Sequence, residues 1–253
     1  MTVIDLNCDL GEAFGAWRMG EDEALLRVVS SASIACGFHA GDPSTMRRTC
    51  AAAAGRGVAI GAHVGYRDLA GFGRRPMRVP AAELADEITY QIAALDGFAR
   101  LAGSRVRYVK PHGALYNTVA EDEEQAVALA EAVRRYDPEL AVVGLAGSAG
   151  LRIAAEHGLT AVAEAFADRA YTRQGTLVSR LEQGAVLHDT GEIVERCVGM
   201  VREGRVAAVD GTVIEFSAQT VCVHGDTPGA VEIARRLSGG LRAAGVELRP
   251  FTG

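Results

Sequence analysis

Short apolar runs alternate with longer segments of helical periodicity along the whole chain. The runs have the length of buried strands, and the segments between them carry apolar residues three or four positions apart, as amphipathic helices do. Residues 81–101 are the clearest case, with Leu84, Ile88, Ile92 and Leu95 on one helical face. The expected strands are residues 3–8, 32–37, 58–62, 106–110, 140–145, 160–166 and 220–223, with a further short strand near 246. The expected helices are residues 22–30, 43 to 55 or 57, 81–101, 120–136, 148–157, 191–202 and a last one that ends near 244.

Local signals refine these bounds. Asp42 precedes Pro43, so Asp42 can accept hydrogen bonds from free N–H groups at a helix start, and proline at the first helical position loses none. The pair Asp210-Gly211 divides residues 206–216 and favours a type I′ turn, so we expect a β-hairpin there. Residues 167–189 show neither the apolar run of a buried strand nor the periodicity of a helix, so we expect an irregular section there.

Strands that alternate with helices, with no break in composition, predict a single α/β domain over residues 1–253. About seven such units favour a parallel barrel or near-barrel over an open sheet. A flavodoxin-like or Rossmann sheet is the alternative, but no Gly-x-Gly-x-x-Gly turn follows the first expected strand.

The composition of the chain excludes some classes of binding partner and indicates its compartment. The chain has 49% apolar and 23% charged residues and a net charge of −6, which argues against nucleic acid or an anionic membrane surface. No apolar run approaches the roughly 18 residues of a membrane span, and the first residues do not resemble a signal peptide. The five cysteines are odd in number and lack CxxC spacing, which indicates free buried thiols in a reducing compartment. We therefore expect a cytoplasmic protein.

Lys110 is the only lysine among 26 basic residues. Because arginine supplies every other basic residue, we expect arginine wherever a solvated positive charge suffices. Lysine differs in offering a compact ammonium that can act as a point charge. Lys110 ends an apolar strand, just before His112 and Gly113. This setting predicts an active-site ammonium at the end of a buried strand; a surface lysine left by codon usage is the plainer alternative.

Other polar residues also gather directly after the expected strands. In a parallel barrel these ends meet at one face, where barrel enzymes place their sites. Glycines beside the histidines permit sharp turns and a close approach of a ligand to the backbone. We therefore expect one shared site built from Asp9, Glu12, His39, Asp42, His63, Asp68, Lys110, His112, Asn117, His224 and Asp226.

The chemistry of this set allows two interpretations. Asp9 with His39 and His63 offers oxygen and nitrogen ligands suited to a divalent transition metal. The same side chains could instead act as acid and base around a carbonyl, because histidine titrates near neutrality and a nearby carboxylate orients it.

The section after the sixth expected strand adds further usable groups. Arg169, Tyr171 and Arg173 could contact a substrate, and Lys110 with Arg169 or Arg173 could hold its anionic group or a phosphoryl oxygen. Residues 71–75 could form a lid over the site. The sequence contains no Walker-type phosphate loop and no Gly-x-Ser-x-Gly nucleophile elbow.

Taken together, these motifs resemble the LamB/YcsF family. The matching segments are Asn7-Cys8-Asp9-Leu10-Gly11-Glu12, Ala35-Cys36-Gly37-Phe38-His39-Ala40-Gly41-Asp42-Pro43, Gly61-Ala62-His63-Val64-Gly65-Tyr66, Val109-Lys110-Pro111-His112-Gly113-Ala114-Leu115-Tyr116-Asn117 and Val223-His224-Gly225-Asp226. The resemblance implies a seven-stranded (β/α) barrel similar to glycoside hydrolases and polysaccharide deacetylases. It also implies a subunit of an ATP-dependent 5-oxoprolinase, which opens the lactam of 5-oxo-L-proline to L-glutamate, with ATP and Mg²⁺ as co-substrate and with partner subunits B and C.

By motif position, the resemblance makes Asp9, His39, His63, Lys110 and His112 the expected catalytic residues. Our hypothesis gives Lys110 the stabilisation of a phosphate or oxyanion, and His112 with His63 the proton transfers; Asp9 and His39 would orient them or bind a metal. Two alternatives stay open: a stand-alone metal-dependent deacetylase or amidohydrolase, and a non-catalytic subunit that only binds substrate.

Overall fold

A computed structural model describes residues 2–180, 182–215, 217–227 and 229–252. Its parallel strands close into a seven-stranded barrel, because each strand pairs with the next and the last pairs with the first. The barrel prediction is therefore confirmed. An additional strand, β10 (Val246–Leu248), pairs with the start of the first one, at Thr2, Val3 and Ile4. The barrel strands are β1 (Thr2–Leu10), β2 (Ser31–Ala35), β3 (Ala59–Val64), β4 (Val106–Pro111), β5 (Ala141–Leu145), β6 (Thr160–Phe166) and β9 (Thr220–Val223).

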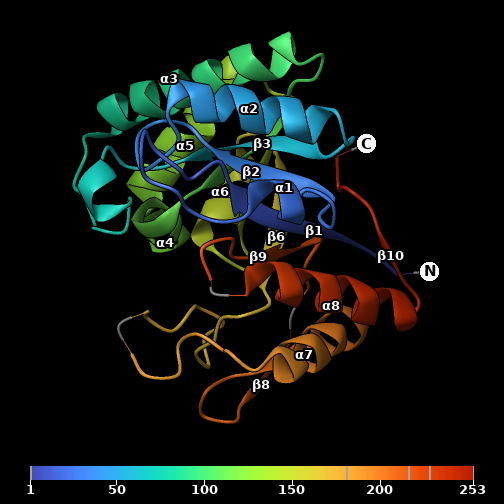
Figure 1. Ribbon diagram of the computed structural model, residues 1–253. Coiled ribbons are helices and arrows are strands. Elements are labelled where there is room, and N and C mark those ends of the chain that lie inside the picture. The colour runs from blue at the N-terminus through green and yellow to red at the C-terminus, as the bar shows by residue number, and fades with distance from the viewer. Residues whose placement is uncertain (1, 181, 216, 228, 253) are drawn as a thin grey trace.

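Helices surround the barrel (Figure 1). Their apolar faces pack on the outer side chains of the strands, and together these form the main hydrophobic core. A short 3-10 helix, η1 (Leu69–Gly71), lies between β3 and α3. The helices are α1 (Asp22–Leu25), α2 (Pro43–Ala54), α3 (Ala81–Leu101), α4 (Gly113–Glu121), α5 (Glu123–Tyr136), α6 (Ala149–Glu156), α7 (Thr190–Glu203) and α8 (Ala230–Ala243).

Part of the barrel interior is polar, and β1 shows why. Side chains of a strand point alternately to its two faces, so Leu6 and Cys8 join the outer apolar core while Asp5, Asn7 and Asp9 point inward. Asp5 accepts hydrogen bonds from hydroxyls of Ser30, Ser31 and Thr220. A buried carboxylate needs such donors. The inward-pointing polar side chains of β1 thus extend along the barrel interior to the carboxyl end of the strand.

Two of the predicted helices are wrong in extent. The expected helix over residues 22–30 ends at Leu25, and the chain continues in turns; the β-branched pair Val28-Val29 is a poor helix former there. The expected helix over residues 120–136 is two helices, because Asp122 adopts an extended conformation between α4 and α5 and caps the second by accepting a hydrogen bond from the Gln125 N–H.

The hairpin is present, but its turn differs from the prediction. β7 (Arg205–Ala207) pairs antiparallel with β8 (Val213–Glu215). A type I′ turn needs positive φ at both central residues, whereas only Gly211 of the pair Asp210-Gly211 has it, with φ of 83°. The loop is longer, and the Ala208 N–H donates to the Thr212 carbonyl at its base. Phe216, the last residue of the predicted hairpin, lies outside the described residues.

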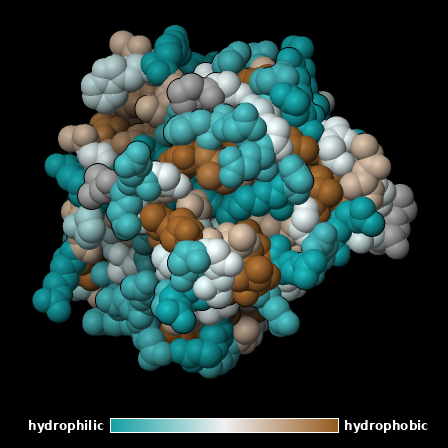
Figure 2. All heavy atoms as spheres, turned by 90° about the horizontal axis from the view of Figure 1, so that it is seen from below, coloured by the Kyte–Doolittle hydropathy of each residue, from teal (hydrophilic) through white to brown (hydrophobic). Residues whose placement is uncertain are grey.

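The state of the cysteines and the distribution of apolar residues can be compared with what the composition predicted. All five cysteines are free and buried, as predicted. In the parts of the chain that the structure describes, no helix combines the length and apolarity needed to cross a membrane. Figure 2 shows that hydrophobic patches on the face seen from below are small and separated by hydrophilic atoms.

Candidate active site

A cavity of about 650 Å³ opens at the carboxyl ends of the barrel strands. It is lined by groups that the sequence analysis placed in the site and by others that it did not. The predicted residues on its wall are Asp9, Glu12, His63, Lys110, His112, Asn117, Arg169, His224 and Asp226. His39 lies directly behind the wall, with its ring stacked 3.7 Å from that of His112. Residues at the carboxyl ends of several barrel strands therefore lie around one cavity, as expected for a closed parallel barrel.

Lys110 ends β4 with its ammonium inside the barrel, 1% exposed. Its Nζ lies 2.9 Å from Asp9 Oδ1, 2.8 Å from Glu164 Oε1 and 3.2 Å from Asn7 Oδ1. Burial alone would lower the pKa of Lys110, but the negative groups around it, Asp9 foremost, hold this pKa well above its usual value. The lysine is thus a permanent ammonium whose donors are already taken, and it acts on the cavity through Asp9.

Asp9 and Glu12 are neighbouring carboxyls with opposite behaviour. Burial raises the pKa of Asp9, but His63 and Lys110 more than offset it and hold the pKa well below the usual range. Burial, together with the charges of Asp9 and Asp226, raises the pKa of Glu12 well above its usual range. Two carboxyls whose environments push their pKa values apart are typical of sites that need a fixed anion beside a group able to carry a proton.

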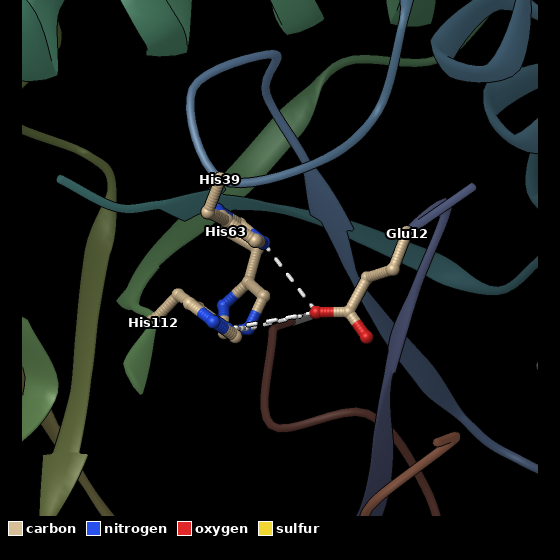
Figure 3. A group of neighbouring side chains, drawn as sticks. All are labelled: Glu12, His39, His63 and His112. Carbon is tan, nitrogen blue, oxygen red and sulfur yellow. Dashed lines mark hydrogen bonds and ion pairs between the residues drawn. The ribbon is translucent and has the colours of Figure 1, made fainter. Parts of the chain in front are cut away.

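Glu12 points at three imidazoles that come from the ends of successive strands (Figure 3). Its Oε1 lies 3.4 Å from His39 Nε2, 4.0 Å from His63 Nε2 and 3.5 Å from His112 Nδ1. The nitrogens His63 Nε2 and His112 Nδ1 are 3.0 Å apart. All four side chains are buried. We call this set, Glu12, His39, His63 and His112, the imidazole cluster.

The imidazole cluster has the residue types of a metal site and overlaps with the ligand set expected from the sequence. That set was Asp9, His39 and His63. Asp9 directs one oxygen to Lys110 and the other to His63, at 3.3 Å. Glu12, which the expected set did not include, lies within 4.0 Å of a nitrogen of each of the three imidazoles. A second group that could hold a metal ion consists of Asp9, Cys222 and His224.

The pKa values of two cluster histidines are displaced downward. Burial lowers the pKa of His39 well below its usual value, and the nearby His112 and His63 add to this effect. Burial and His63 do the same for the pKa of His112. Both rings are therefore neutral near pH 7, which leaves each with one nitrogen lone pair.

His224 belongs to an Asp–His pair on the opposite side of the cavity. Its Nδ1 lies 2.8 Å from Asp168 Oδ1, and its ring stacks on Phe166. Burial raises the pKa of Asp168, but the charge of His224 outweighs it and the net shift is downward. A carboxylate that holds the Nδ1–H of a histidine leaves Nε2 available as a base.

The loop after β3 closes one side of the cavity. Arg74 pairs with Asp226 across the mouth, with 2.6 Å between Nη2 and the carboxylate. Phe72 is the one non-glycine residue with positive φ in the described chain, and its carbonyl lies 2.7 Å from His112 Nε2. A Cβ on Gly73 would lie 2.8 Å from both His39 and His112, so only glycine lets this loop pack against the rings.

Four predicted site residues lie away from the cavity wall. Asp42 caps α2 and accepts from the Ser44 and Thr45 N–H groups, as its position before Pro43 also predicted. Asp68 caps η1 and pairs with Arg75. The Tyr171 hydroxyl accepts from the Phe166 N–H and supports the end of β6, while Arg173 is exposed. Asp42, Tyr171 and Arg173, which were expected to contact substrate, are thus not among the residues that line the cavity.

Arg169 lines the cavity but is largely committed to its own loop. Its guanidinium donates to the carbonyls of Ala185 and Val178, and burial lowers the pKa of Arg169 to about 10.

Several buried members of the site were not predicted from the sequence. Glu164 and Cys222 contact Lys110, and Tyr116 lines the cavity with a phenol whose pKa is raised well above its usual value by burial and by Glu164. The period-2 placement of Asp5, Asn7 and Asp9 in β1 was a usable signal, because three polar residues on one strand face imply polar partners from other strands.

A closed parallel barrel with buried carboxylates, imidazoles and an ammonium at the carboxyl ends of its strands defines this protein as a barrel enzyme by its architecture and site. The sequence model of the LamB/YcsF family matches residues 4–253, and the chain belongs to this family.

Relatives match over nearly the whole chain. A protein of Paracidovorax citrulli, named as the A subunit of 5-oxoprolinase, is 60% identical over 248 residues, which cover 98% of this chain and 99% of the relative. One of Mycobacterium avium with the same name is 60% identical, with 99% and 100% covered. The crystal structure of a "Lactam Utilization Protein" from Thermus thermophilus is 43% identical, covers 98% of this chain and 100% of its own, and superposes with a TM-score of 0.94.

Proposed function

We propose that this chain is the A subunit of an ATP-dependent 5-oxoprolinase, in which it takes part in opening the lactam of 5-oxo-L-proline to L-glutamate. The observation that carries the proposal is the 60% identity, over 98% of the chain, to a protein named for that activity. The cavity supports it, because about 650 Å³ is ample for a five-membered cyclic amide, and polar groups converge on it from several strands.

The chemistry of the lactam explains why ATP is needed. A five-membered lactam is a stable amide, and transfer of the γ-phosphoryl group of ATP to its carbonyl oxygen activates the carbon for attack by water. Attack by this water and cleavage of the C–N bond give the free amine and a γ-glutamyl phosphate. A second water then releases phosphate and leaves the carboxylate of glutamate. This sequence needs an anionic or basic group to take a proton from water and an acid for the leaving nitrogen.

Residues on the wall of the cavity supply these roles. His224, oriented by Asp168, is the group that can accept a proton, and Asp9, fixed as a carboxylate by Lys110, supplies a permanent negative charge. Tyr116 stays a phenol and can donate. The Arg74 guanidinium at the mouth offers a positive charge to the carboxylate of the substrate or to a phosphoryl oxygen.

Partners and location complete the proposal. The names of the relatives describe one component of a larger complex, and we propose that subunits B and C join this one, that ATP with Mg²⁺ is the co-substrate, and that the complex works in the cytoplasm.

The test is an ATP-dependent assay of glutamate release from 5-oxo-L-proline with purified chain alone and with candidate B and C subunits. We expect turnover only in the complete complex, and loss of turnover with Lys110→Arg, since the bulkier guanidinium does not fit the closed ring of acceptors. Full turnover by Lys110→Arg would contradict the role given to the ammonium.

A second candidate function is favoured by the imidazole cluster. A metal-dependent deacetylase or amidohydrolase would act alone, without ATP. Turnover of an amide substrate by the isolated chain, abolished by a chelator, would support that alternative. If histidine substitutions weaken only substrate binding while turnover per bound substrate persists, the chain is a binding subunit.

A further inference from the structure

We propose that the imidazole cluster is a four-ligand site for a divalent transition-metal ion of the Zn²⁺ type, with Glu12 Oε1, His39 Nε2, His63 Nε2 and His112 Nδ1 as its ligand atoms. This inference concerns metal binding by the isolated chain and is independent of the lactam chemistry proposed above.

The hydrogen bonds of two rings decide which nitrogens face the centre of the cluster as lone pairs. His63 Nδ1 lies 3.1 Å from the Lys110 carbonyl, and His112 Nε2 lies 2.7 Å from the Phe72 carbonyl. A carbonyl oxygen only accepts, so these nitrogens carry the protons. The remaining nitrogens, His63 Nε2 and His112 Nδ1, are then the ones that face the centre of the cluster, where they lie 3.0 Å apart. Asp9 Oδ2 also lies 3.3 Å from His63 Nε2.

The other two members bring further acceptors to the same point. Glu12 Oε1 and both ring nitrogens of His39 are buried without a hydrogen-bond partner, and His39 is 0% exposed. A neutral imidazole keeps one proton, so one of the two His39 nitrogens is a lone pair. This lone pair and Glu12 Oε1, packed together and shielded from water, repel each other and lose their hydration. A cation at the centre of the cluster satisfies both of them.

A single proton satisfies fewer of these buried acceptors than a metal ion does. One proton on Glu12 Oε1 can be donated to one of the three nitrogens, which leaves the other lone pairs without a donor. A divalent ion accepts a pair of electrons from each ligand at once.

The spacing of the ligand atoms suits tetrahedral coordination. Ligands about 2.0–2.1 Å from a tetrahedral zinc ion lie about 3.4 Å from one another. Within the cluster, Oε1 of Glu12 lies 3.4 Å from His39, 4.0 Å from His63 and 3.5 Å from His112. All four ligand atoms lie within 4.8 Å of one another, so small side-chain adjustments bring them into place.

The surroundings have the outer contacts that metal-bound histidines use. Such histidines donate their second N–H to a carboxylate or a backbone carbonyl, which fixes the tautomer. His63 and His112 do this with the Lys110 and Phe72 carbonyls. Phe72 holds its carbonyl there in a left-handed conformation, with φ of 53°, which an L-residue adopts at a cost. The conformation of this loop thus places a hydrogen-bond acceptor beside His112 Nε2.

The test is a titration of the metal-free, full-length chain with Co²⁺ alone, followed by visible absorption, with Zn²⁺ as competitor. We expect one Co²⁺ per chain, intense bands of tetrahedral coordination and their loss on addition of Zn²⁺. His39→Ala and His63→Ala should each weaken Co²⁺ binding by more than the roughly 10–100-fold that loss of an outer contact costs. His157→Ala, at the end of α6 and outside the cluster, is the matched control and should bind as the wild type does.

Thermal unfolding monitors the fold of each variant. Co²⁺ should raise the transition temperature of the wild type and of His157→Ala, but not that of His39→Ala or His63→Ala. Absence of binding by the wild type, or unchanged affinity in both cluster variants, would overturn the proposal. So would weak octahedral bands, or loss of the bands in His224→Ala, which would place the ion in the group of Asp9, Cys222 and His224.

Discussion

The Lys110 ammonium and the Glu164 carboxylate form an ion pair across the inside of the barrel, with 2.8 Å between Nζ and Oε1. They lie on β4 and β6, which are separated by β5 in the sheet, so the pair spans the interior rather than a neighbouring register position. Asn7 of β1 donates to the same Glu164 oxygen at 2.9 Å. Three strands are thereby tied together below the cavity floor.

Removal of this ammonium should be costly. Lys110→Met leaves Glu164 and Asp9 without their cation, and loss of one partner of a buried pair costs about 3–5 kcal/mol. We expect a decrease of this size in the free energy of unfolding, measured by urea denaturation. The double variant Lys110→Met, Glu164→Gln should recover part of the loss, because one of the unpaired charges is then gone. A cost no greater than that of an exposed substitution such as Arg134→Met would contradict the pair's role.

Gly61 should not tolerate a side chain. A Cβ at this position in β3 would lie 2.1 Å from the ring of Tyr108, which fills the barrel interior below Lys110 and bonds to Ser33. Overpacking of this kind costs about 1–3 kcal/mol, and we expect Gly61→Ala to lower the free energy of unfolding accordingly. Gly97→Ala is the matched control: it lies in α3 with nothing within 4 Å of the added Cβ, so it should stabilise by about 0.5–1 kcal/mol. Equal effects of the two would refute the steric argument.

Asp5 should make stability depend on pH. Burial raises the pKa of Asp5 to about 6 in the folded protein, from 3.8. Between these values the folded state holds a proton that the unfolded state has released, so the free energy of unfolding falls as pH rises from about 4 to about 6. The contribution is about 3 kcal/mol, from roughly two pKa units at 1.36 kcal/mol each.

The variant Asp5→Asn isolates this effect, because other groups titrate equally in both proteins. We expect its free energy of unfolding, relative to the wild type, to improve by about 3 kcal/mol between pH 4 and pH 7, measured by denaturation at several pH values. A difference that stays constant over this range would exclude a raised pKa for Asp5.

The Asp168–His224 pair should act as a unit in turnover. Asp168→Asn removes the carboxylate that orients His224, and loss of general acid–base assistance costs about 10²–10⁴-fold in rate. We expect a decrease of this order in kcat of the reconstituted complex for Asp168→Asn and for His224→Ala. The double variant should be little worse than either single one, since residues that act together are not additive. Multiplicative losses would indicate separate roles.

The success of the barrel prediction and the errors in the helix and turn predictions have different physical origins. The strands were recognisable because each is buried on both sides by the fold and carries a compact apolar run. The turn at Asp210-Gly211 was wrong because turn type depends on strand register, which only the paired strands fix. The break at Asp122 was missed because helical periodicity over residues 120–136 does not show that one residue leaves the helical conformation to cap the helix that follows.

The sequence by itself determined the alternation of strands and helices, the grouping of histidines and acids after the strands, and the isolation of one lysine. Only the tertiary structure decided that Glu12 lies near all three of His39, His63 and His112, and that the Lys110 ammonium is surrounded by acceptors from several strands. The reason is that strand order and local periodicity are encoded by near neighbours in the chain, whereas which side chains meet at a barrel mouth depends on strand stagger and loop paths set by the closed sheet as a whole.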